Sequence, residues 1–122
     1  MIPLEKQVTN LELTKDLKEA GYVQEGLWWW WINKLSDKGT PNLCSYGDSK
    51  PKESWTVIVA PTVAELGEAL PVETNTTQYE SNTGAKGLWI CEQADLIHHE
   101  RANTEADARA KMYLYLKKEG LL

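Results

Sequence analysis

The sequence lacks long apolar segments and has few basic residues. No apolar run approaches the ~18 residues that a membrane-spanning helix needs. The segment MIPLEKQVTN at the start also lacks the apolar region of a secretory signal. We therefore expect a cytoplasmic protein that does not cross a membrane. The formal net charge is -5 and the 13 Lys and Arg residues are scattered, so we expect no nucleic-acid partner, because binding to phosphate backbones depends on Lys and Arg.

Cysteine and histidine are scarce too, with two residues of each. Cys44 and Cys91 are expected to be free thiols, because a reducing cytoplasm disfavours disulfides. Two cysteines also cannot build a structural zinc site without help from other ligands. His98 and His99 are adjacent, whereas the histidines of known metal signatures are separated by about three or four residues. We therefore expect neither a metal site nor a cofactor.

Motifs for phosphate binding and catalysis are also missing. The lysine within residues 84–87 is not part of a phosphate-binding loop, and this segment leads into a predicted strand like a hairpin turn. Cys91 lies inside a predicted strand with no motif that would place a base beside it. We therefore expect a protein that is not an enzyme. The alternative that stays open is a small enzyme using Cys44, His98 or His99.

The residues that are present predict three helices, the first two with clear N-terminal caps. Asn10 is suited to cap a helix over about 10–20. Thr62, followed three residues later by Glu65, has the capping-box pattern and predicts a helix over about 62–69. The third helix is capped by Asn103 or Thr104 and ends at about residue 118.

Strands are predicted where β-branched and aromatic residues are bounded by turn formers. The expected strands are 27–33, 43–46, 54–61, 74–80 (at a sheet edge), 87–93 and, as a short strand or a crossing loop, 95–102. The short turns between them favour antiparallel pairing. We therefore predict an α+β fold, with three helices packed on a small, mostly antiparallel sheet. A single domain is expected over 1–122, with residues 1–9 as a loosely attached lead-in.

Four of the six tryptophans stand in a row at 28–31. Neighbouring side chains of a strand point to opposite faces, so a sheet with one buried face could bury only two of the four. One interpretation is a central strand covered on both faces by the chain itself. The other is an outward-facing pair that exposes about 300–500 Å². Such a patch would suit a homodimer, a protein partner, or the stacking of a sugar or a base.

We predict that Trp28, Trp30 and Ile32 point to the core, and that Trp29 and Trp31 lie nearer an interface.

The last helix contributes a second part of this expected interface. Its apolar surface is wider than one stripe, which predicts contacts with the sheet and with something else. Thr104 and Asp107 form a weaker capping box at its start. Met112 and Leu116 lie on a flank of the stripe, and we add them to the candidate interface.

Three segments carry a recognisable pattern: LKEAGYVQEGLWWWWIN (17–33), APTVAELGEALP (60–71) and ANTEADARAKMYLYLKKEGLL (102–122). The pattern is a helix ending near a glycine and a glutamine, an aromatic strand, a TVAELGE-LP helix and a closing NTEADARAK helix. It resembles a family of short uncharacterised phage- and prophage-associated bacterial proteins. The resemblance covers nearly the whole chain, with variable loops near 34–53 and 72–86. It implies no activity and no catalytic residues.

Together these observations predict a non-catalytic accessory protein of phage or prophage type. It would act through protein–protein binding or self-association by its aromatic strand. The alternative is a module that stacks a sugar or a base on exposed tryptophan.

Overall fold

The computed structural model describes residues 3–33, 41–45, 55–71, 74–80, 86–93 and 98–122. Within these ranges the elements are α1 (Leu4–Gln7), α2 (Leu11–Glu19), β1 (Trp29–Asn33), β2 (Asn42–Cys44), β3 (Trp55–Val59), α3 (Val63–Ala69), β4 (Thr74–Glu80), β5 (Lys86–Gln93), β6 (His98–Ala102) and α4 (Glu105–Lys118). The chain is α+β with antiparallel strands, as predicted. None of the helices in these ranges has the length and apolarity needed to cross a bilayer.

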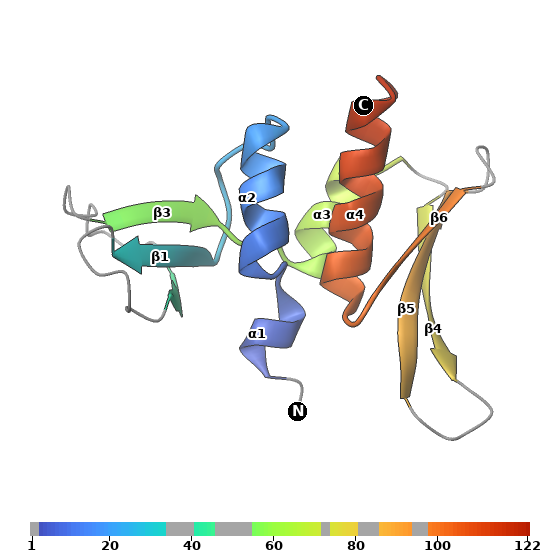
Figure 1. Ribbon diagram of the computed structural model, residues 1–122, viewed down its shortest axis with the longest axis horizontal. Coiled ribbons are helices and arrows are strands. Elements are labelled where there is room, and N and C mark those ends of the chain that lie inside the picture. Colours follow the sequence, from blue (N-terminus) through green and yellow to red (C-terminus); the bar gives the residue numbers. More distant parts are fainter. Residues whose placement is uncertain (1–2, 34–40, 46–54, 72–73, 81–85, 94–97) are drawn as a thin grey trace.

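The strands form two separate sheets rather than the single sheet that we predicted. One has the order β2-β1-β3 and the other the order β4-β5-β6. In Figure 1 the two sheets lie at opposite ends of the molecule, with α2, α3 and α4 between them. Each sheet is built from three strands that are consecutive in the chain, and α3 separates the two groups. Apolar periodicity predicts that a strand exists but not which strand pairs with it. The pattern therefore did not predict the division of the strands into two sheets.

Helix α4 occupies the centre of the fold. It contacts α1, α2 and α3 as well as all three strands of the second sheet. Its buried residues lie all round the helix: Ala106, Asp107, Ala108, Ala110, Met112, Tyr113 and Leu116. Burial on several sides of a helix is typical of such a central position. The predicted contact with a sheet and with something else is therefore confirmed, and the other partners are helices of the same chain.

The predicted helix caps are present. The side chain of Asn10 accepts a hydrogen bond from the backbone N–H of Leu13 at the start of α2. Thr62 and Glu65 form the full capping box of α3. Thr104 caps α4, but Asp107 does not complete a capping box there. Its carboxylate instead accepts the backbone N–H of Asn10 at 2.8 Å and the side-chain Nδ2 of Asn10 at 3.0 Å. Asp107 thus joins the beginnings of two helices that are distant in sequence.

The lead-in is more firmly attached than we expected. Val8 and Thr9 are fully buried. The backbone N–H of Thr9 donates to the carbonyl oxygen of Pro61 at 2.9 Å, its hydroxyl donates to the same oxygen at 3.2 Å, and Val8 forms a β-bridge with Thr62. The expectation of a loose segment over 1–9 is therefore wrong for its last two residues, because they fill a place beside the start of α3.

Candidate functional site

The tryptophan-rich sheet β2-β1-β3 projects from the helical layer. Figure 1 shows it beyond α2, with the C-terminal end of β3 nearest the helices. Burial rises along β3 in the same direction: Trp55 to Val57 are half-buried, whereas Ile58 is 5% and Val59 1% exposed. The helices therefore cover one end of this sheet, and the other end extends away from them.

Register divides the side chains of this sheet between two faces, because residues opposite each other on paired strands share a face. The first face, called the Trp29 face, carries Trp29, Trp31, Asn42, Cys44, Trp55, Val57 and Val59. The second, called the Trp30 face, carries Trp30, Ile32, Leu43, Thr56 and Ile58. No member of either face is charged.

The Trp30 face turns toward the helices at its near end. The indole Nε1 of Trp30 donates to the backbone oxygen of the buried Thr9 at 3.0 Å. Ile58, directly opposite Trp30, lines an open groove together with charged residues of α2. These contacts anchor the sheet to the N-terminal half of the helical layer.

The Trp29 face is organised by contacts within the sheet and its entry turn. The Nε1 of Trp29 donates to the backbone oxygen of Gly26 at 3.1 Å. The rings of Trp31 and Trp55 meet edge to face, with centroids 6.2 Å apart and an interplanar angle of 65°. Pairs of this geometry stabilise by about 0.5–1.5 kcal/mol beyond the area that they bury. The sequence pattern did not assign Trp55 to the interface, although its strand was predicted over 54–61.

Burial does not separate the two pairs of tryptophans. Trp28, Trp29, Trp30 and Trp31 are all half-buried. The assignment of Trp29 and Trp31 to an interface therefore stays a prediction. Exposure in β3 follows the distance from the helices and does not alternate between the two faces.

The other two residues of the expected interface lie elsewhere. Met112 and Leu116 have no exposed area and belong to the core of the helical layer. A side chain without accessible area cannot contact a second chain, so the structure removes both from the candidate interface. Their position on the flank of α4 reflects the central place of this helix.

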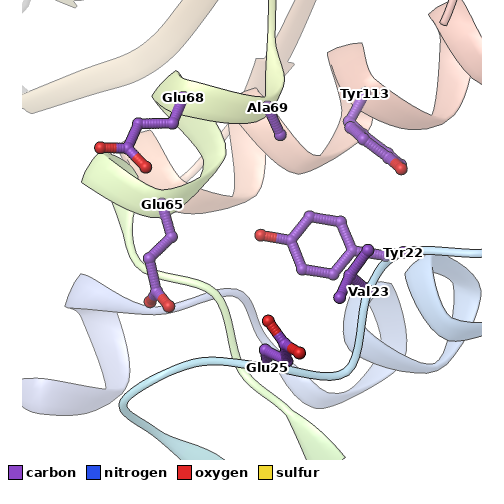
Figure 2. A pocket seen from close by; sticks show the side chains of 7 residues that line it. All are labelled: Tyr22, Val23, Glu25, Glu65, Glu68, Ala69 and Tyr113. Carbon is purple, nitrogen blue, oxygen red and sulfur yellow. The ribbon is translucent and has the colours of Figure 1, made fainter.

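A shallow pocket of about 250 Å³ lies between the turn after α2 and α3. Figure 2 shows Tyr22 and Tyr113 on one side and the carboxylates of Glu25, Glu65 and Glu68 around the Tyr22 hydroxyl. The two rings meet edge to face at 5.2 Å. Burial, followed by the negative charge of Glu65, raises the pKa of Tyr22 to about 12.

This pocket has little catalytic capacity. The Oε1 of Glu65 already accepts the backbone N–H and the hydroxyl of Thr62, each at 3.0 Å. Tyr22 keeps its proton at neutral pH, and the residues that line the pocket include no histidine, cysteine or serine. The pocket thus lacks a nucleophile paired with a base.

The residues of the enzyme alternative are not brought together. Cys44 lies in β2 and is exposed, whereas His98 and His99 lie in β6 of the other sheet, at the opposite end of the molecule (Figure 1). The imidazole of His98 stacks on Tyr115 with centroids 3.5 Å apart, and its Nε2 is 3.1 Å from Glu100. Cys44 therefore does not form a cysteine–histidine pair with His98 or with His99.

In the part of the chain that the structure describes, neither Cys91 nor the metal-ligating residue types form a candidate site. Cys91 is fully buried, and burial raises the pKa of its thiol to about 11, so the reactive thiolate is disfavoured at neutral pH. Among the described residues, no group of three or more His, Cys, Asp or Glu side chains could hold a metal ion. The sheet β2-β1-β3 is therefore the feature that calls for a functional explanation.

No protein-family model matches this chain, and the comparisons with curated proteins and with solved structures gave no match.

Proposed function

We propose that this chain is a non-catalytic binding protein that self-associates through the sheet β2-β1-β3. The observation that supports the proposal is the position of this sheet: it extends beyond the helices, and the four consecutive tryptophans, three of which lie in β1, are half-buried. Aromatic side chains contribute disproportionately to protein interfaces because they bury a large area with few rotatable bonds.

Charge favours a second copy of the chain as the occupant. The chain carries a net charge of -5, yet the Trp29 and Trp30 faces have no charged member. Two copies can therefore approach through this sheet without placing like charges directly opposite each other. A cationic partner would instead be expected to select an acidic surface.

The expected association is weak. Half-buried rings leave only part of the 150–250 Å² that an aromatic side chain can bury, so the open area falls short of the ~800 Å² per partner of a standard interface. We therefore expect a dissociation constant of about 10⁻⁶ M or weaker. Self-association at this level responds to local protein concentration.

We further propose that the chain is a phage- or prophage-type accessory protein of the bacterial cytoplasm. The support is the resemblance carried by residues 17–33, 60–71 and 102–122. Genes for phage structural or regulatory proteins beside its gene are the expected finding, and a neighbourhood of housekeeping genes would argue against this role.

Light scattering on a sizing column, over protein concentrations of about 1–500 μM, tests self-association. We expect the mean mass to rise from 13.8 kDa toward twice that value. Trp31→Leu should weaken the association about tenfold or more, as expected for an aromatic anchor. The matched control is Trp89→Leu, which removes a half-buried tryptophan from the central strand of the other sheet and should leave the association unchanged.

A mass of 13.8 kDa throughout this range would overturn the proposal. If the monomer instead showed tryptophan fluorescence changes on addition of a sugar or a base, the stacking alternative would be favoured.

A further inference from the structure

Strand β3 has one edge that faces β1 and one that faces away. The backbone N–H of Ala60, just after β3, donates to the oxygen of Trp28 at 2.8 Å. In an antiparallel pair such bonds alternate along the strand. The backbone groups of Ile58 and Thr56 therefore face β1. Those of Trp55, Val57 and Val59 point to the outer edge.

Within the described chain, the hydrogen bond found at this outer edge of β3 lies at its end near the helices. The backbone N–H of Val59 donates to the side-chain Oε1 of Gln24 at 3.1 Å, which confirms its outward direction. No strand of the described chain pairs with this side of β3, because β3 is the last strand in the sheet order β2-β1-β3. The N-terminal end of β3, which begins at Trp55, projects beyond the helices (Figure 1).

The other described edge strands carry features that discourage strand addition. Strand β2 has only three residues, β4 is polar and has a register irregularity near Gln78, and β6 presents exposed His99 and Arg101. Short length, irregular register and charge are the usual protections of sheet edges. Strand β3, with the sequence WTVIV, has no charge, no proline and no register shift against β1. It is the least protected edge in the described chain.

We propose that β3 pairs antiparallel with β3 of a second copy, about a two-fold axis at Thr56. Trp55 then lies opposite Val57 of the second copy, and Val57 opposite its Trp55. Both pairs use outward backbone groups, so Trp55 and Val57 of each chain form four main-chain hydrogen bonds in total. The result is one continuous sheet in the order β2-β1-β3-β3-β1-β2. This inference rests on the proposed self-association and specifies its geometry.

The second copy is favoured because the segment is self-complementary. The two-fold axis places each tryptophan opposite a valine, and aromatic–β-branched pairs are among the favourable cross-strand neighbours. The pairing ends before Val59, so the Gln24 contact is kept. Main-chain hydrogen bonds contribute affinity that the small open area of the tryptophan faces does not supply.

Val57→Pro tests the pairing. Proline removes the outward N–H of Val57 and leaves the hydrogen bonds between β1 and β3, since the amide of Val57 does not face β1. We expect the dissociation constant of the dimer to rise by about 100-fold or more, the scale of two lost main-chain bonds in the dimer, one donated by each chain. The far-ultraviolet circular dichroism should stay that of the parent. A folded variant with unchanged dimerisation would overturn the inference.

A charge pair at position 56 tests the axis without proline. Thr56→Glu and Thr56→Lys each place like charges opposite each other across the axis, so each variant alone should be monomeric at concentrations where the parent dimerises. An equimolar mixture should recover the dimer as a mixed pair. Asn42→Glu and Asn42→Lys, at an exposed position on the opposite edge strand β2, are the matched controls and should change the dissociation constant by less than about twofold.

The outcomes separate the two proposals. A parent chain that never dimerises contradicts the proposed function itself. A parent that dimerises and is weakened by Trp31→Leu, but not by Val57→Pro or by like charges at Thr56, contradicts the edge pairing alone. Recovery of the dimer only in the mixture supports the axis at Thr56.

Discussion

Replacing Asp107 by alanine tests the contact that joins the beginnings of α2 and α4. Asp107 is 8% exposed, and its two carboxylate oxygens accept the backbone N–H and the Nδ2 of Asn10 at 2.8 and 3.0 Å. Both acceptor positions are lost in Asp107→Ala. The four orphan amides at the start of α2 would then have one partner fewer, because the backbone N–H of Asn10 loses its acceptor.

The size of the effect follows from these contacts. A hydrogen bond to a charged group contributes about 1.5–3 kcal/mol. Asn10 is exposed, so water replaces part of the loss when the carboxylate is removed. Removing the carboxylate also relieves the cost of its burial. We therefore expect Asp107→Ala to lower the free energy of unfolding by about 2 kcal/mol, which is a decrease in Tm of roughly 6–10 °C.

Urea unfolding followed by circular dichroism measures this loss. Asp16→Ala removes an exposed carboxylate from α2 and is the matched control, with an expected change within about 0.5 kcal/mol. Asn10→Ala removes the cap of α2 and one of the two bonds, so the double variant should lose about 1 kcal/mol less than the sum of the single variants. Additive effects, or a loss below about 0.5 kcal/mol for Asp107→Ala, would refute the reasoning.

Three further outcomes are expected from local contacts. Gly26→Ala should destabilise the fold by about 1–3 kcal/mol in urea unfolding, because an added Cβ would lie 2.7 Å from Cγ2 of Val59 and 2.6 Å from Oε2 of Glu65. An unchanged unfolding midpoint would show that the turn accommodates the methyl group without cost. Cys44 should react with a thiol reagent at pH 8 and Cys91 only after unfolding, because Cys91 is buried and its pKa is raised to about 11; equal rates in the native protein would contradict this. The folded-state pKa of Tyr22 is raised from 10.0 to about 12, so its stabilising contribution is present below pH 10 and is lost as the pH rises toward 12. Phenolate absorbance should show a late-ionising tyrosine that Tyr22→Phe removes, and an unchanged titration in that variant would count against the assignment.

Local motifs of the sequence predicted local structure well. Asn10, Thr62 with Glu65, and Thr104 all cap helices as expected, because a cap depends on residues within one turn of each other. The breadth of apolar surface on α4 also predicted correctly that this helix has more than one partner. Its assignment to an interface was wrong for Met112 and Leu116, because a helical wheel does not distinguish a second chain from neighbouring helices of the same chain.

Non-local contacts were harder to predict. The division into two sheets depends on pairings that periodicity does not specify, and the burial of Val8 and Thr9 depends on Pro61, which is 52 residues away from Thr9. The contact of Asp107 with Asn10 spans 97 residues. The tryptophan run posed the same problem, since all four rings are half-buried and the alternation of faces did not predict their burial.

Sedimentation velocity of the parent chain and of equimolar Thr56→Glu and Thr56→Lys tests the central claim most directly. We expect a concentration-dependent dimer for the parent, monomers for each charged variant alone, and a dimer again in their mixture. A parent that stays at 13.8 kDa up to about 500 μM, or a mixture that stays monomeric while the parent dimerises, would contradict it.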